Sequence, residues 1–125
     1  MKPEDDDISS KKNLGRLTAN GRRVLWKAEV EATTLGQHSV GALHIFIAIL
    51  RSPETAAARV LQSIGFDLES LTRSISDASG HVETRTSVRR QLSAEGRNVL
   101  QSAALEAERM GIRFIGTEHL LLGVL

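Results

Sequence analysis

The sequence predicts an all-α fold, a pseudo-twofold duplicated helical bundle whose second repeat lacks its last two helices. Three observations support this prediction. Apolar residues make up 41% of the 125 residues but aromatic ones only 3%, so the core must be aliphatic, as is typical of packed helices. The chain contains an internal repeat, and both copies space their apolar residues at the 3.6-residue period of a one-faced helix. The length suits one domain with a modest core.

The internal repeat appears when the chain is shifted by 75 residues. Residues 17–50 then align with residues 92–125 without a gap, and 13 of the 34 aligned positions are identical. This similarity indicates a duplication, although its period is too long for a simple solenoid. We therefore divide the chain into a flexible tail (1–16) and one domain (17–125). The parts of that domain are repeat one (17–77), a polar linker (78–91) and an incomplete repeat two (92–125).

Each copy begins with the pattern of a capped helix. Thr18 and Ser93 stand at the N-cap position, and Gly36 and Gly111 stand where a left-handed residue ends a helix. The apolar positions between these limits correspond in the two copies: 24, 25, 28, 32 and 35, then 99, 100, 103, 107 and 110. The pattern predicts an amphipathic first helix in each repeat.

A second helix is expected to start near Gly41 and near Gly116. Both segments are apolar almost all round, which is typical of a buried helix. Gly21 and Gly96 lie on the inner face of the first helices, where glycine costs about 1 kcal/mol relative to alanine. We expect a second helix backbone to pass close to them; fraying at the helix start is the alternative.

Between the two copies the sequence predicts two more helices. Ser52 can cap the first of them, with Pro53 at its first helical position and Gly65 after its end. Asp67 can cap the second. The expected buried face of that helix carries Leu68, Leu71 and Ile75.

Composition excludes several classes of function. A net charge of +1 provides no global field toward nucleic acid or membrane, and the absence of cysteine excludes disulfides and thiolate zinc sites. No apolar run is long enough to span a bilayer, and the N-terminus "MKPEDDDISSKKN" lacks the apolar core of a signal peptide. We expect a cytoplasmic protein. Clustered basic residues, such as Lys11, Lys12 and Arg16, are interpreted as solvated surface.

The chain shows no pattern of a catalytic, cofactor or metal site. It has no Gly-x-x-x-x-Gly-Lys-Ser/Thr loop for nucleotide phosphates and no His-Glu-x-x-His pair for zinc. We expect no enzyme activity, no cofactor and no metal; any ATPase module would lie outside this sequence.

Three stretches carry a family resemblance: "RRVLWKAEVEATTLGQHSVGALHIFIAIL", "AAARVLQSIGFDLESL" and above all "LEAERMGIRFIGTEHLLLGVL". Together they resemble the duplicated N-terminal domain of Clp ATPases of the ClpA/ClpC type, over residues 17–125. The resemblance implies an all-α domain of two four-helix repeats. It also implies that the domain docks protein substrates or adaptors for an unfoldase ring that feeds a protease. In ClpC-type relatives an acidic residue of each Gly-Thr-Glu-His signature recognises phosphorylated arginine.

The signature is complete only in repeat two. The candidate ligand-binding residues there are Thr117, Glu118 and His119. The degenerate equivalents in repeat one are Ala42, Leu43 and His44. A guanidinium needs a carboxylate partner that leucine does not offer, so we expect repeat one to be inactive and Glu118 to carry any phosphoarginine site. The alternative for Glu118 is a helix cap that only complements the dipole.

The positions of two histidines and of the single tryptophan indicate their roles. His44 and His119 are interpreted as structural histidines packed at helix starts. Trp26, the only tryptophan, is expected on the outer face of its helix, where repeat two has Gln101. Exposed tryptophan is enriched in binding hot spots, so Trp26 is a candidate contact residue; packing against the tail or linker is the alternative.

The apolar face of the last helix (117–125) is expected to lack cover. A shortened domain, proteolytic trimming and burial in a homodimer each account for this ending. For the whole chain, the alternative function is a helical nucleic-acid-binding regulator, since short helix pairs joined by glycine turns also form helix-turn-helix units.

Overall fold

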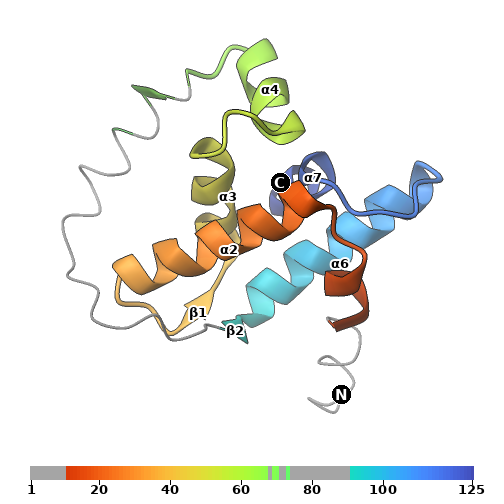
Figure 1. The fold of residues 1–125 in the computed structure, drawn as a ribbon, viewed down its shortest axis with the longest axis horizontal. Helices are drawn as coiled ribbons and strands as arrows, with labels where there is room; N and C mark the ends of the chain where they lie inside the picture. Colours follow the sequence, from red (N-terminus) through yellow and green to blue (C-terminus); the bar gives the residue numbers. More distant parts are fainter. Residues whose placement is uncertain (1–10, 68, 71–72, 74–90) are drawn as a thin grey trace.

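The computed structural model describes residues 11–67, 69–70, 73 and 91–125, and their fold is mostly helical (Figure 1). The tail residues 1–10, the linker residues 78–90 and the predicted face Leu68, Leu71 and Ile75 lie outside the described residues. The elements with described bounds are α2 (Ala19–Thr34), β1 (Ser39–Val40), α3 (Ala42–Leu50), α4 (Ala56–Ser63), β2 (Gln91–Leu92), α6 (Ala94–Arg109) and α7 (Thr117–Val124). Residues 11–15, 69–70 and 73 are also helical. The predicted helix pairs α2–α3 and α6–α7 are therefore confirmed.

The ends of α2 and α6 follow the sequence pattern. The hydroxyl of Thr18 accepts a hydrogen bond from Gly21 N–H at 3.0 Å, and the hydroxyl of Ser93 accepts one from Gly96 N–H at the same distance. Gly36 and Gly111 both have a φ of 70°, the left-handed conformation that ends a helix. Local sequence signals thus fix both ends of both helices.

The two repeats are joined by short extended segments that the sequence did not predict. Strand β1 runs parallel to β2, with Val40 paired to Leu92, and Leu17 forms the equivalent parallel bridge to Ile115 (Figure 1). Leu92 and Leu17 precede α6 and α2, the first helices of the two repeats. Each of them pairs with a residue that precedes the second helix of the other repeat, Val40 before α3 and Ile115 before α7. The two halves are therefore interlocked through their backbones.

These pairings explain the two inner-face glycines and correct the expectation for them. A Cβ on Gly96 would collide with the carbonyl oxygen of Val40, and one on Gly21 would lie 3.2 Å from the carbonyl oxygen of Ile115. A backbone does pass close by, as expected, but it belongs to an extended segment and not to a helix.

The core lies between the helix pairs and is aliphatic. Helix α3 is its most buried element, with Ile45, Ala48 and Ile49 completely inaccessible. None of the helices in the described part of the chain is long and apolar enough to cross a lipid bilayer.

The expectation that the last helix lacks cover was wrong for most of α7. His119, Leu120 and Leu121 are buried, because α6, α3 and α4 all pack against this helix. Only its C-terminal end stays open, where Leu122 is 45% and Leu125 87% exposed. A homodimer contact would therefore have far less apolar surface than the sequence indicated.

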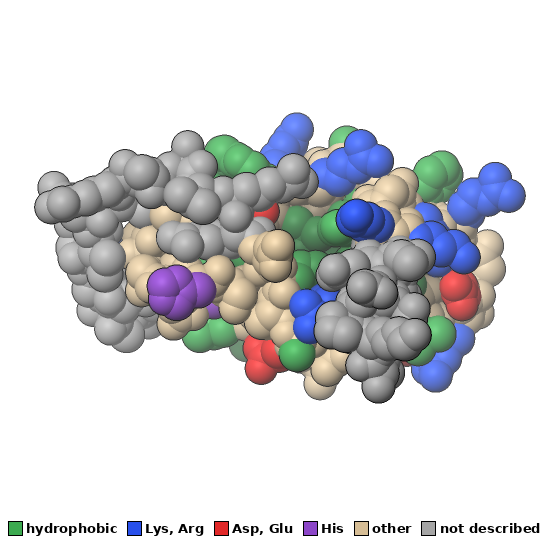
Figure 2. Space-filling model, turned by 90° about the horizontal axis from the view of Figure 1, so that it is seen from below, with side chains coloured by type: hydrophobic (Ala, Val, Ile, Leu, Met, Phe, Trp, Pro, Cys, Tyr) green, Lys and Arg blue, Asp and Glu red, His purple; other side chains and the backbone are tan. Residues whose placement is uncertain are grey.

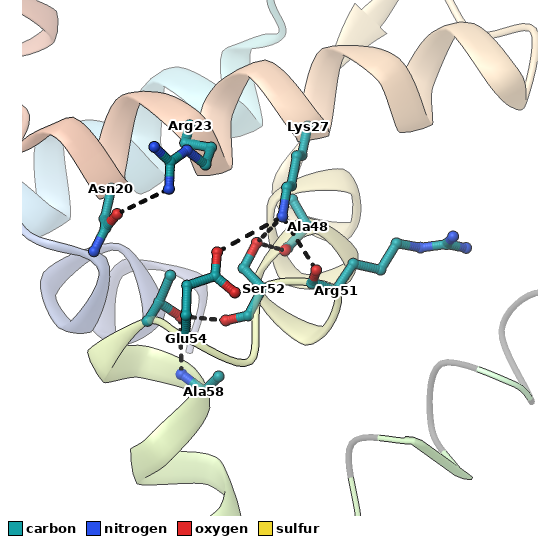
Figure 3. A network of polar contacts seen from close by, with 9 residues as sticks. Asn20, Arg23, Lys27, Ala48, Arg51, Ser52, Glu54 and Ala58 are labelled. Atoms are coloured by element: carbon teal, nitrogen blue, oxygen red, sulfur yellow. Dashed lines mark hydrogen bonds and ion pairs between the residues drawn. The ribbon is translucent and has the colours of Figure 1, made fainter.

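The predicted start of α4 was also wrong. Helix α4 begins at Ala56 and is capped by Thr55, whose hydroxyl accepts a hydrogen bond from Ala58 N–H. The hydroxyl of Ser52 instead donates to Ala48 C=O at 2.8 Å and accepts from the ammonium of Lys27 at 2.9 Å, so it closes the end of α3 (Figure 3). Pro53 consequently precedes the helix. The end at Gly65 is confirmed, with a φ of 101°.

The N-cap that the sequence predicts for the helix after α4 is also present. The carboxylate of Asp67 accepts a hydrogen bond from Ser70 N–H at 3.3 Å, as predicted for an N-cap residue.

We expect Gly96→Ala to lower the free energy of unfolding by about 1–2 kcal/mol, because overlap with the Val40 carbonyl outweighs the helix propensity gained. Gly15→Ala is the matched control, since a Cβ there meets no atom within 4 Å. The control should be neutral or slightly stabilising. Urea unfolding followed by circular dichroism measures both variants, and a Gly96→Ala protein as stable as the parent would contradict the close approach.

Candidate functional site

The start of α7 contains the residues of the repeat-two signature. Gly116 is the N-cap in an extended conformation, and its own N–H donates to Nδ1 of His119 at 2.9 Å. The next two backbone N–H groups, of Thr117 and Glu118, have no hydrogen-bond partner among the described residues. Free N–H groups at a helix start favour negative charge, since the helix dipole is positive there.

Thr117 faces the protein interior. It is 3% exposed, and its hydroxyl accepts a hydrogen bond from Ala57 N–H, at the start of α4, at 3.1 Å. This bond fastens a helix of repeat one to a helix of repeat two. The side chain of Thr117 is thus structural, and only its backbone N–H remains for a ligand.

Glu118 is the signature residue that faces solvent. Its side chain is 38% exposed, and its carboxylate fills the space where a Cβ on Gly116 would lie. No described N–H donates to this carboxylate, and its 3.6 Å approach to Nδ1 of His119 is too long for a hydrogen bond. Its oxygens are therefore free to accept from a ligand beside the unpaired N–H groups.

His44 and His119, interpreted from the sequence as structural, are both buried at helix starts, so the ring of the candidate ligand-binding residue His119 does not face solvent. Each ring is buried, and Nδ1 of His44 accepts from Gly41 N–H at 2.8 Å, matching the repeat-two bond. Because Nδ1 accepts, we assign the neutral tautomer with the proton on Nε2. Neither Nε2 atom has a partner among the described residues. Each histidine thus supplies the half of a capping box in which the third helical residue accepts from the N-cap N–H.

Repeat one contains a carboxylate that the sequence analysis missed. Ala42 N–H donates to Oε1 of Glu95 at 2.7 Å, and Glu95 belongs to α6 of the other repeat. Leu43 is 59% exposed and makes no polar contact there. The residue of repeat one that aligns with Glu95 is Asn20. This difference between the two copies was the sequence signal that could have pointed to Glu95.

Trp26 lies on the outer face of α2, as expected, with 62% of its surface exposed. One turn further along α2, Val30 is 44% exposed. Together they form a small apolar surface, which we call the Trp26–Val30 surface. The alternative, packing against tail or linker, concerns residues outside the described ranges.

Charged side chains are mixed with hydrophobic ones on the surface of the molecule (Figure 2). On the face in Figure 2, Lys and Arg side chains gather over one half, interspersed with hydrophobic and acidic ones. Several described basic residues pair with acids, as Arg51 does with Glu31 at 2.8 Å. Within the described ranges, no three His, Asp or Glu side chains are grouped so that they could hold a metal ion.

The burial of His44 predicts that the stability of the protein depends on pH. Burial lowers its pKa from the ordinary value of 6.5, while the carboxylate of Glu95 acts in the opposite direction. The unfolded chain therefore binds a proton at a higher pH than the folded protein, and stability falls as the pH drops through about 6.5. We expect His44→Gln to reduce the loss of stability between about pH 7.5 and about pH 5.5.

His38→Gln is the control for this measurement, because His38 is exposed. Urea midpoints at the two pH values report the difference, and NMR titration of the His44 ring reports its pKa directly. A pKa above 6.5, or equal pH dependence in the two variants, would show that burial does not govern His44.

Comparison with known proteins places this geometry in a family. The model of the Clp repeat (R) N-terminal domain matches residues 16–125. The ClpC/MecB protein of Bacillus subtilis, a negative regulator of genetic competence, is 31% identical over 112 residues, or 90% of this chain. The ATP-binding subunit ClpC of the Clp protease from Staphylococcus aureus is 30% identical over the same length. The chain spans 14% of the length of each relative.

Solved structures show the same fold at lower identity. The N-terminal domain of the ClpV1 ATPase from the E. coli EAEC Sci1 T6SS superposes with a TM-score of 0.78 at 20% identity, covering 96% of this chain and 74% of that one. The Hsp104 N-terminal domain from Candida albicans gives 0.69 at 14% identity, covering 86% and 72%. The duplicated helix pairs, their interlocked extended segments and the family match over residues 16–125 together establish that the chain belongs to the Clp repeat N-terminal domain family.

Proposed function

We propose that this chain is a non-catalytic protein-binding module that docks substrates or adaptor proteins for a Clp unfoldase and protease system. The family match and the similarity to Clp ATP-binding subunits support this role. A further structural neighbour, with a TM-score of 0.74 and 20% identity, is described as "Peptide from EAEC T6SS Sci1 SciI protein". A peptide is thus associated with a domain of this fold.

The start of α7 supports a phosphoarginine-type site. The observation that carries this proposal is the half-exposed carboxylate of Glu118 beside two unpaired backbone N–H groups. The N–H groups suit the phosphoryl oxygens, and the carboxylate suits the guanidinium through paired hydrogen bonds. The carboxylate of Glu118 would repel a simple anion. The carboxylate and the N–H groups together therefore favour a ligand that has both a positive and a negative charge.

The Trp26–Val30 surface is the proposed second contact region. Large exposed aromatic side chains contribute strongly when a partner excludes water around them. Since Trp26 and Val30 are exposed, a docking protein could bury both without displacing the core.

The nucleic-acid alternative has less support. A recognition helix must present polar side chains to a groove, whereas α3 and α7 are largely buried. The basic residues are mixed with acids and hydrophobic side chains, unlike a continuous basic patch (Figure 2).

We expect free phosphoarginine to shift the backbone amide resonances of Thr117 and Glu118. Glu118→Gln should weaken this binding at least about tenfold, because the amide cannot accept two charge-assisted hydrogen bonds from the guanidinium. A ¹⁵N–¹H NMR titration measures both proteins.

Glu106→Gln is the control, since it removes one carboxylate from the surface of α6, where Glu106 pairs with Arg109. Binding unchanged in Glu118→Gln would sink the proposed site. Salt-dependent binding of duplex DNA, without any response to phosphoarginine, would favour the alternative function.

A further inference from the structure

The starts of α3 and α7 have the same backbone geometry. Ser93 N–H donates to Val40 C=O at 2.9 Å, and the equivalent Thr18 N–H donates to Ile115 C=O at 2.9 Å. The two histidine bonds to the glycine N–H groups differ by only 0.1 Å, at 2.8 and 2.9 Å. Any difference in ligand access between the two helix starts must therefore come from side chains.

The decisive side chains belong to the first helices, α2 and α6. From α6, Glu95 crosses to the opposite repeat and accepts from Ala42 N–H at 2.7 Å. Its Oε1 also lies 3.0 Å from the position of a Cβ on Gly41, so this glycine leaves room for it. The carboxylate occupies the place where an anionic ligand would meet α3.

The aligned residue on α2 does not reach across in the same way. Asn20 only accepts a long, 3.5 Å hydrogen bond from Arg23 on its own helix (Figure 3). The N–H groups of Thr117 and Glu118 therefore stay unpaired. An amide one methylene shorter than glutamate neither spans the gap nor brings a negative charge.

We propose that Glu95 is a cross-repeat latch that closes the start of α3 to phosphoryl ligands by pairing with its N–H group, while Asn20 leaves the N–H groups at the start of α7 unpaired beside the carboxylate of Glu118. The residue pair 20/95 then determines which repeat binds, in addition to the exchange of Leu43 for Glu118. For repeat two this inference rests on the proposed function, but for repeat one it does not.

Charge and hydrogen bonding both support the latch. Helix starts stabilise carboxylates, and a bond from N–H to a charged oxygen is stronger than a neutral one. Burial lowers the pKa of His44, and the nearby carboxylate of Glu95 acts in the opposite direction, as expected for a negative charge beside the start of α3. A phosphoryl group at Ala42 would have to displace this carboxylate or remain beside a like charge.

A reciprocal exchange tests the latch. Glu95→Asn should open repeat one, so that inorganic phosphate shifts the amide resonances of Ala42 and Leu43, which stay unchanged in the parent protein. Glu106→Asn, which removes another carboxylate from α6, is the matched control and should leave both resonances insensitive. Glu95 is exposed, so its replacement leaves the core intact.

The opposite change should close repeat two. Asn20→Glu is expected to weaken phosphoarginine binding at Thr117 and Glu118 at least about tenfold. Asn98→Glu adds the same charge at an exposed site of α6 and should have little effect.

A direct readout of the latch needs no ligand. In an acid titration of the parent protein followed by NMR, the Ala42 amide resonance should move, and this movement should be absent in Glu95→Asn. An Ala42 resonance insensitive to that titration would overturn the latch.

The phosphate experiments separate the two proposals. Equal responses of Ala42 and Leu43 to phosphate in the parent and in Glu95→Asn, or no response in either, would also overturn the latch. If phosphoarginine leaves Thr117 and Glu118 unchanged in the parent protein, the proposed phosphoarginine site fails, while the phosphate experiment on repeat one still decides the latch.

Discussion

The extended pairing between the two repeats is the constraint on which the rest of the structure depends. Each pairing places the residue before one repeat's first helix against the residue before the other repeat's second helix, as Val40 meets Leu92. The approach is so close that Gly96 has no room for a side chain. A glycine inside a helix has a cost, and here the cost is offset by the junction that it permits. Helices α3 and α7 enter the core in fixed positions because their preceding residues are fixed.

The same junction sets the chemistry of the helix starts. Glycine at the N-cap brings no hydroxyl or carboxylate for the first N–H groups of the helix, while His44 and His119 accept the N–H of the glycine itself from inside the core. The space that each glycine leaves is filled by a carboxylate oxygen. In repeat one this oxygen comes from Glu95 of the other repeat, and in repeat two it comes from Glu118 of the same helix. A carboxylate therefore lies beside each helix start, but it comes from a different element in each repeat, and the two sites are unequal.

This inequality suits a docking module. Helices α3 and α7 are largely buried and hold the scaffold, whereas the half-exposed Glu118 and the Trp26–Val30 surface face solvent. The proposed docking role requires a few accessible groups at defined positions, because binding to groups that are already in place has no ordering cost. The hydroxyl of Thr117 holds the start of α4, while its N–H has no partner among the described residues.

The sequence by itself determined the all-α class, the duplication, the caps at Thr18 and Ser93 and the outward position of Trp26. These features depend on local periodicity, on hydrogen bonds three residues apart and on the comparison of two copies within one chain. The tertiary structure decided the partners of Gly96, the cover over α7, the cap of α4 and the role of Glu95. The contacts of Glu95 and Gly96 join residues more than 50 positions apart, and no local pattern encodes them. The sequences at the starts of α3 and α7 share the glycine and the histidine. Whether a distant carboxylate reaches a helix start depends on how the helices pack.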